Sequence, residues 1–230
     1  ITGPDLMQKF LTHVKEYNVP LVEAEVVSIE KTQKGFLVKT SDKKKYESKT
    51  ILFANGMTHR KLGVPGEKEF SGKGVHYCYA CDGPLYKNKT VAIIGGSDAA
   101  ALGTLFMEAY AKKIYVIYRS EKLRAEPISA QKVYKMKKTE VIHNTNVVEI
   151  YGEKFVKGVK TDTKKNIPLD AVFIEVGHLP LSDLAKGIGV KLDKKGFIPV
   201  DKNQMTNIPG IFAAGDITNA TSLKQFITSA

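Results

Sequence analysis

Cysteine is scarce in this chain: only Cys78 and Cys81 occur among its 230 residues. Two cysteines cannot make the disulfide framework that stabilises many small secreted domains, which favours a reducing compartment such as the cytoplasm. Long apolar runs are also missing. The longest are short pieces such as "TVAIIGG", so no membrane-spanning helix is expected. With 43% hydrophobic residues, the composition predicts a soluble globular protein with one large core or two small ones.

Acidic residues are fewer than basic ones, 24 against 35, which leaves a net charge of +11. A charge of this sign raises the question of nucleic-acid binding. The lysines, however, stand in scattered pairs such as Lys112-Lys113, and no basic stripe with interleaved aromatic residues occurs. A stacking platform for nucleic acid needs such a stripe. We therefore expect solvated surface charge and no nucleic-acid partner.

The first residues, "ITGPDLMQKF", contain no initiator methionine and no basic-then-apolar signal pattern. This start predicts a segment of a longer chain. Apolar residues at helical spacing predict a helix over about 4–17, which Pro20 prevents from continuing. Three β-like runs then predict a meander, at 24–32, 35–41 and 49–56.

A different pattern begins at residue 91. An apolar strand over 91–94 runs into a Gly-Gly turn, followed by a predicted helix over about 99–110 and a second strand over 114–118. Two parallel strands joined by a helix need this spacing, so we expect a β-turn-α-β unit. The last portion, from about 195, is predicted to begin with a strand and to end in the start of a helix. A further helix and several strands complete the predicted α/β domain, at 128–138, 140–152, 155–162 and 170–178.

The turn after the first apolar strand reads Gly95, Gly96, Ser97, Asp98, Ala99, Ala100. Amides at the start of a helix point toward a bound pyrophosphate, and glycine allows its close approach, so this turn predicts a dinucleotide site. Ser97 replaces the second glycine of the usual fingerprint, while Ala100 keeps a small residue at the third position. The alternative is a plain strand-to-helix turn without a ligand.

Two arginines, Arg119 and Arg124, follow the second strand in "YRSEKLRAE". An NAD site has an acid here for the ribose hydroxyls, whereas two guanidiniums suit the 2′-phosphate of NADP. We therefore expect NADPH as the nucleotide. Two alternatives stay open: both arginines are surface charges, or Glu121 engages a ribose hydroxyl.

The cysteines form a C-x-x-C pair that is followed directly by Asp82. A zinc site needs four ligands, and the chain has neither further cysteines nor histidines at ligand spacing, so no metal is expected. A structural disulfide over so short a loop would add little stability. A redox dithiol fits best, with Asp82 as the proton donor or acceptor of thiol exchange, or otherwise as a cap of the next turn.

Six segments together resemble the low-molecular-weight thioredoxin reductases: "CYACDG", "VAIIGGSDAAA", "YRSEKLRAE", "VGHLP", "PGIFAAGD" and "QFITSA". Their order and spacing match that family across essentially the whole chain. The resemblance implies an α/β fold of two Rossmann-like nucleotide-binding domains, in which an NADPH domain interrupts a FAD domain. The implied boundaries are 1–57 for the first part of the FAD domain, 58–177 for the NADPH domain with the cysteine pair, and 178–230 for the return of the FAD domain.

The resemblance also implies an activity. Electrons would pass from NADPH to FAD, then to the Cys78–Cys81 disulfide, and then to thioredoxin or a similar small dithiol protein. Cys81 would face the flavin, Cys78 would attack the partner disulfide, and Asp82 would be the acid/base. Family members are usually homodimers, so a homodimer is expected. Cofactor contacts are implied for a further set of residues: Gly177, Gly215, Asp216, Gln225, Phe226 and Ile227.

Some features depart from the family pattern. We expect the 230 residues to lack the family's N-terminal flavin-binding βαβ unit and the tail after "ITSA". Asn55, Ser97 and Ser120 stand where threonine, glycine and arginine are usual. Three alternatives follow: a related flavin disulfide reductase or dithiol oxidase with another partner, a truncated dinucleotide-binding module without catalysis, and, least favoured, a thioredoxin-like domain with its own C-x-x-C pair.

Overall fold

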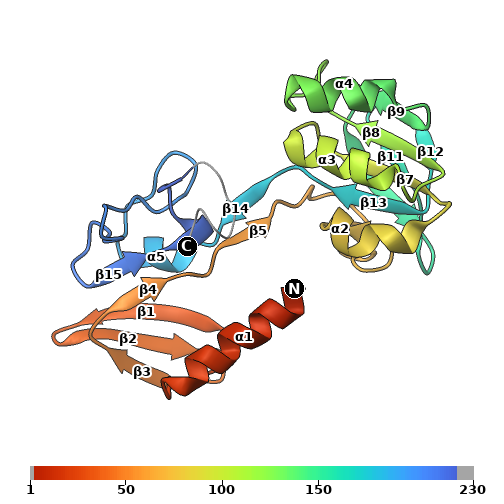
Figure 1. Cartoon of the computed structure of the whole chain (residues 1–230). Helices are drawn as coiled ribbons and strands as arrows, with labels where there is room; N and C mark the ends of the chain where they lie inside the picture. The colour runs from red at the N-terminus through yellow and green to blue at the C-terminus, as the bar shows by residue number, and fades with distance from the viewer. Residues whose placement is uncertain (1–2, 222–230) are drawn as a thin grey trace. The chain divides into compact units, whose positions relative to one another are not determined.

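The computed structural model describes residues 3–221 and divides the chain into two compact units (Figure 1). Unit 1 comprises residues 1–56 and 180–230, and unit 2 comprises residues 57–179. The predicted insertion over 58–177 starts one residue after unit 2 begins and ends two residues before unit 2 ends. None of the helices in the described part has the length and apolar character that crossing a membrane requires.

Unit 2 is built on a parallel sheet of five strands. Its central strand, β7, is buried on both faces: Val91, Ala92 and Ile93 have no exposed surface. Continuous apolar strands of this kind are typical of parallel sheets that are covered on both sides. The strands, in spatial order, are β6 Val75–His76, β13 Ala171–Ile174, β7 Thr90–Ile94, β8 Lys113–Ile117 and β9 Thr139–Ile142.

Different elements cover the two faces of this sheet (Figure 1). Because side chains alternate along a strand, Val91 and Ile93 pack with the helices, while Ala92 and Ile94 pack with a second, antiparallel sheet. The helix that joins β7 to β8 lies where the glycine turn predicts it. The covering elements are α3 Asp98–Met107 and α4 Pro127–Lys135 on one face, and β10 Val147–Gly152, β11 Val156–Thr161 and β12 Asn166–Pro168 on the other.

Two short helices connect β6 to β7 and carry the cysteine pair. They are α2 Tyr79–Asp82 and the 3₁₀ helix η1 Gly83–Tyr86, in which Pro84 takes a position near the start. α2 packs against α3, and Gly83 is buried with its Cα facing the Met107 sulfur. Two further strands pair with each other. They precede and follow the five-stranded sheet in the sequence and are β5 Met57–His59 and β14 His178–Pro180.

Unit 1 contains an antiparallel meander and a separate pair of parallel strands. Its core is formed by buried residues that include Phe36, Phe53, Ile198 and Ile211. The strands are β1 Val26–Thr32, β2 Gly35–Thr40 and β3 Lys45–Ser48 in the meander, and β4 Ile51–Phe53 with β15 Ile211–Ala213 in the pair. The helices are α1 Gly3–Glu16, α5 Asp183–Gly187 and the 3₁₀ helix η2 Gly215–Ile217.

Two strand predictions for unit 1 are wrong. The third strand of the meander is β3 rather than residues 49–56, because the lysine-rich segment pairs with β2 and keeps its charges on the exposed side. β4 leaves the meander and pairs with β15, far along the chain. Near residue 195 no strand forms; Ile198 makes a single bridge to Thr218. The predicted helix start at the end of the chain lies outside the described residues.

Candidate active site

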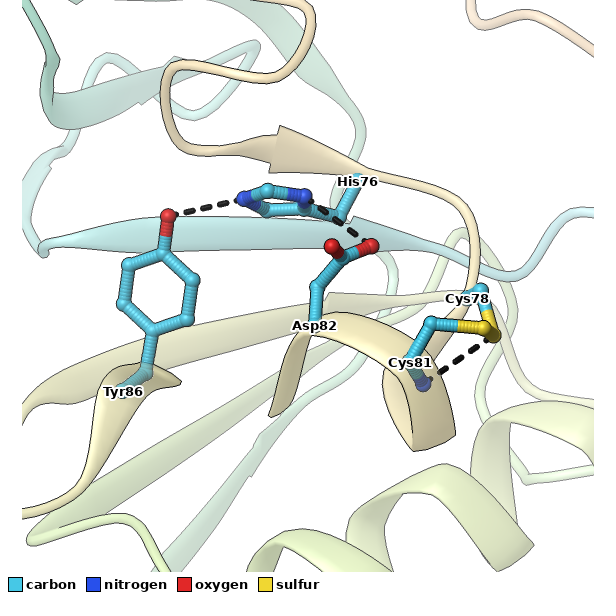
Figure 2. Close-up of polar contacts among 5 residues, drawn as sticks. All are labelled: His76, Cys78, Cys81, Asp82 and Tyr86. Atoms are coloured by element: carbon cyan, nitrogen blue, oxygen red, sulfur yellow. Dashed lines mark hydrogen bonds and ion pairs between the residues drawn. A yellow bond between two sulfur atoms is a disulfide. The ribbon is translucent and has the colours of Figure 1, made fainter. Parts of the chain in front are cut away.

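Cys78 and Cys81 are joined by a disulfide at the start of α2 (Figure 2). Cys78 is the residue that caps this helix, and its Sγ accepts a hydrogen bond from the Cys81 backbone N–H at 3.1 Å. Cys81 is exposed and Cys78 is half-buried. Access to a sulfur atom governs thiol–disulfide exchange, so this disulfide can meet an external thiol. No group of three or more possible metal ligands occurs within residues 3–221.

Asp82 is the last residue of α2, and its carboxylate turns toward a buried histidine (Figure 2). Asp82 Oδ2 lies 3.2 Å from His76 Nδ1, and His76 Nε2 lies 2.7 Å from the Tyr86 hydroxyl. The sequence predicted a role for Asp82. From the sequence, His76 was weighed only as a possible zinc ligand, and no role was predicted for Tyr86. A signal for His76 was its place two residues before Cys78.

The three hydrogen-bonded side chains Asp82, His76 and Tyr86 lie against apolar residues. His76 is buried and stacks on Phe173, the residue directly beside it in the sheet. Burial lowers the pKa of His76, against the opposing effect of Asp82, so its imidazole is neutral at pH 7. The pKa of Tyr86 is raised by burial and by the nearby carboxylates of Asp82 and Asp170.

The turn after β7 is tightly packed at both glycines. Gly95 has a φ of 143°, and a Cβ there would lie 2.3 Å from the Glu175 carbonyl oxygen. A Cβ on Gly96 would lie 2.5 Å from the Tyr118 ring. The Gly96 carbonyl accepts a hydrogen bond from the Arg124 backbone N–H, which ties the loop after β8 to the turn. Only glycine therefore fits these positions without a shift in the surroundings.

Beside this turn, unit 2 contains a cavity of about 350 Å³. Gly95, Gly96 and Ser97 lie along it, as does Gly177, whose carbonyl accepts a hydrogen bond from the Arg60 backbone N–H. Asp98 and Ala100 are not among the lining residues. The Asp98 carboxylate instead accepts a hydrogen bond from the Glu126 backbone N–H at 2.6 Å, and Ala100 is buried beneath Gly95. Four cationic side chains line the cavity: Arg60, Lys61, Arg119 and Arg124.

The buried residue Glu67 holds the loop that contains two of these cations, Arg60 and Lys61. The Glu67 carboxylate accepts hydrogen bonds from the Leu62 and Gly63 backbone N–H groups and from the Tyr77 hydroxyl. Lys61 Nζ lies 3.6 Å from the centre of the Tyr77 ring. The contribution of this loop was missed, because nothing in the local sequence places it beside the glycine turn.

Glu175 is the one carboxyl group among the lining residues. Its side chain is 95% buried at the end of β13, and within residues 3–221 it has no hydrogen-bond or ion-pair partner. Burial raises its pKa to about 7. An acidic residue that changes charge near neutral pH therefore lies beside a cationic cavity, which the sequence did not indicate.

The residues implied for flavin contact belong to unit 1. Gly215 has a φ of 79°, and its carbonyl accepts hydrogen bonds from the backbone N–H and hydroxyl of Thr218. Asp216 is half-buried in η2, directly after β15. Gln225, Phe226 and Ile227 lie outside the described residues. No cofactor-contact assignment is tested by these positions, and each stays a prediction.

Comparisons with known proteins identify the family of this chain. The sequence profile of the pyridine nucleotide-disulphide oxidoreductases matches residues 4–230. The chain belongs to this family. A thioredoxin reductase of Listeria monocytogenes is 39% identical over 235 residues, which cover 100% of this chain and 73% of that relative.

Solved structures of other pyridine nucleotide-disulphide oxidoreductases share the fold. The thioredoxin reductase of T. acidophilum is 40% identical with a TM-score of 0.79, and that of Lactococcus lactis is 32% identical with a TM-score of 0.82. In both cases the match covers 99% of this chain and 76% of the solved chain. Membership of the family makes this chain an oxidoreductase of disulfides and implies FAD and NADPH as its cofactors.

The residues of unit 2 fit the nucleotide. A glycine turn at a helix start and four cationic side chains suit a pyrophosphate with a further phosphate. For FAD, the described residues of unit 1 offer the turn at Gly215 and Asp216 after a parallel strand. A second glycine-rich turn that leads from a strand into a long helix does not occur among residues 3–56 and 180–221.

Proposed function

We propose that this chain carries the disulfide chemistry of a thioredoxin-disulfide reductase. The observation that carries the proposal is the Cys78–Cys81 disulfide, accessible at the start of α2, with Asp82 adjoining it. The same unit holds the cationic cavity at the glycine turn. The partner in this proposal is thioredoxin or a similar small dithiol protein.

The residues of the chain divide the work as follows. When bound, NADPH and FAD would supply the two electrons that reduce the cysteine pair. In unit 2, Arg119 and Arg124 would hold the 2′-phosphate of NADPH, and the backbone amides after Gly95 would bind its pyrophosphate. Cys78 is the sulfur that attacks the partner disulfide, Cys81 would face the flavin, and Asp82 transfers the proton.

A trapping experiment tests these roles without any cofactor. Cys78→Ser and Cys81→Ser variants are each mixed with oxidised thioredoxin, quenched with acid and alkylating reagent, and separated by non-reducing electrophoresis. The Cys81→Ser variant keeps the attacking sulfur and lacks the resolving one, so it should accumulate the mixed disulfide. The Cys78→Ser variant should not.

Three other outcomes would contradict parts of the proposal. A mixed disulfide with Cys78→Ser alone would exchange the roles of the cysteines. The absence of an adduct with either variant would remove thioredoxin as the partner and favour a related flavin disulfide reductase with another partner. Alkylation of both thiols after mild oxidation of the unaltered chain would remove the redox role itself.

The proposal extends to assembly and compartment. The thioredoxin reductases that the sequence resembles are usually homodimers, and a homodimer in the cytoplasm is the corresponding proposal for this protein. The free thiols that this chemistry needs persist in a reducing compartment. Multi-angle light scattering of the purified protein tests the assembly.

A further inference from the structure

The strongest feature that the proposed function leaves unused is the hydrogen-bonded chain from Asp82 through His76 to Tyr86 (Figure 2). The three side chains come from α2, β6 and η1, on either side of the disulfide in sequence. His76 is only 7% exposed, whereas the Asp82 side chain is 35% exposed. A buried imidazole therefore holds a carboxylate that reaches the surface beside the cysteines.

The contacts of His76 determine which nitrogen carries the hydrogen. A carboxylate only accepts hydrogen bonds, so Nδ1 must be the donor to Asp82. In a neutral imidazole Nε2 then has no hydrogen, and it accepts the hydrogen bond of the Tyr86 hydroxyl. Tyr86 thus selects the tautomer that Asp82 needs. Phe173 covers the ring of His76 and also contacts Tyr86 edge-on, which fixes the plane of the imidazole.

We propose that His76 is a positioning residue for the thiol–disulfide step: its Nδ1–H holds Asp82 Oδ2 in one orientation and leaves Oδ1 to exchange a proton with the cysteines. Tyr86 supports this role by fixing the tautomer. The inference rests on the proposed function, because it assigns Asp82 as the acid/base of the cysteine pair.

The step balances as follows. The thiol of Cys78 gives its proton to Asp82, and its sulfur attacks the partner disulfide, so one S–S bond breaks as the mixed disulfide forms. The departing partner sulfur keeps the electron pair and takes the proton from Asp82. Cys81 then attacks Cys78, re-forms the internal disulfide, and its proton passes to the second partner sulfur. Two electrons and two protons have moved from the cysteine pair to the partner.

Within residues 3–221, Asp82 is the one charged group that acts on the pKa of His76. On the strand beside β6, Phe173 is the facing residue and does not titrate. From α2 and η1 the facing groups are Asp82 and Tyr86. Asp170 acts on Tyr86 and is itself paired with Lys89 at 3.5 Å. The pKa of His76 is therefore governed by its burial and, in the opposite direction, by Asp82.

The test measures the reaction of the reduced chain with an aromatic disulfide, followed by stopped-flow absorbance between pH 5 and pH 9. This assay needs no flavin, nicotinamide nucleotide or thioredoxin. His76→Ala removes the donor that orients Asp82 as the acceptor of the Cys78 thiol proton. We expect the acidic limb of the rate profile, which follows the loss of that thiol proton, to move up by about one pH unit, with about tenfold slower exchange at pH 6. His76→Asn places an amide N–H where Nδ1 was, so it should restore most of the rate.

Further variants separate positioning from general stability. Tyr86→Phe removes one oxygen atom and should shift the profile in the same direction by a smaller amount. It should also change the ¹⁵N shifts of the His76 ring in NMR spectra, which report the tautomer. Tyr134→Phe is the matched control, because Tyr134 makes the same kind of contact with His143 Nε2, at 3.2 Å, beside the opposite edge of the sheet. In an Asp82→Asn background, His76→Ala should have no further effect.

Three results would overturn the inference: a His76→Ala profile that superimposes on that of the unaltered chain, an equal shift with His76→Asn, or a full effect of His76→Ala without Asp82. If neither His76 variant folds, Tyr86→Phe alone tests the inference. An unchanged pH–rate profile together with unchanged ¹⁵N shifts of the His76 ring would then overturn it. A cysteine pair that does not exchange in any form would instead refute the proposed function.

Discussion

At the scale of single residues, we expect Arg119 and Arg124 to set the nucleotide preference of this protein. Both line the cavity beside the glycine turn and follow the second strand of the β-α-β unit, where such units bind the ribose that carries the 2′-phosphate of NADP. Two charge-assisted contacts to that phosphate are worth about 2–4 kcal/mol together. NADPH should therefore bind about 30- to 1000-fold more tightly than NADH. Calorimetric titration with both nucleotides measures the ratio.

The matched variants make this comparison specific. An Arg119→Ala, Arg124→Ala double variant should lose the preference while it keeps the weaker NADH affinity. Lys122→Ala changes an exposed cation of the same loop that does not line the cavity, and the ratio should stay as in the unaltered chain. Equal affinities for the two nucleotides before any substitution would remove the assignment.

Glu175 makes stability depend on pH. Its folded-state pKa, about 7, lies above the ordinary value of 4.5, so the folded chain holds the proton more tightly than the unfolded chain does. Stability should therefore fall as pH rises from about 4.5 to about 7, and the full cost, about 3 kcal/mol, is present above pH 7. Glu175→Gln removes this cost, so the variant should gain more stability at pH 8 than at pH 5.

Urea unfolding followed by circular dichroism measures the difference at both pH values. Glu121→Gln is a suitable control, because Glu121 is exposed on the loop after β8. A gain from Glu175→Gln that is the same at pH 5 and pH 8 would show that the carboxyl group does not titrate in this range.

At the scale of elements, the connection between β7 and α3 depends on the close approach of the Gly96 backbone to the Tyr118 ring. Gly96→Ala would place a methyl group 2.5 Å from the Tyr118 ring, which is itself buried. We expect a loss of about 1–3 kcal/mol in stability, together with weaker nucleotide binding, because the ring must move. Gly187→Ala, where no atom lies within 4 Å of the new Cβ, should be close to neutral. Thermal unfolding and nucleotide titration of both variants check this, and an unaffected Gly96→Ala protein would contradict the packing argument.

At the scale of the whole molecule, unit 1 leaves much apolar surface uncovered. The helix α1 has no buried residue, and large exposed side chains include Met7 in α1, Tyr17 and Leu21 in the segment after it, and Leu52 in β4. Uncovered apolar faces favour association. The described part of unit 1 also offers only the Gly215 turn for FAD. We therefore expect the purified 230-residue protein to be colourless, to associate, and to bind FAD weakly. Unit 2 should be its best-folded part.

Absorbance spectra after FAD addition and gel filtration, together with light scattering over a range of concentrations, measure both properties. Hydrogen exchange compares the protection of the two units. A yellow, monomeric protein with stoichiometric FAD would show that unit 1 holds the flavin as it stands.

Local sequence was enough to predict the features that depend on neighbours in the chain. Gly95-Gly96 between an apolar strand and a helix predicted the β7–α3 connection. A tight turn with a positive φ favours glycine whatever the rest of the fold is. The C-x-x-C spacing predicted a pair that can form a disulfide, because two cysteines three positions apart come close together at the start of a helix. The order of such motifs was also sufficient to indicate the family.

Tertiary structure alone decided what depends on distant segments. β4 pairs with β15 rather than with β3, because long-range pairing competes with the meander and the sequence of one strand does not contain its partner. Burial likewise cannot be read locally: Glu175 acquires its raised pKa, and His76 its place beneath Phe173, only when β13 is inserted between β6 and β7. The sequence therefore determined the chemistry of the cysteine pair, and the fold determined the polar groups around it, because desolvation and hydrogen-bond partners are supplied by residues far away in the chain.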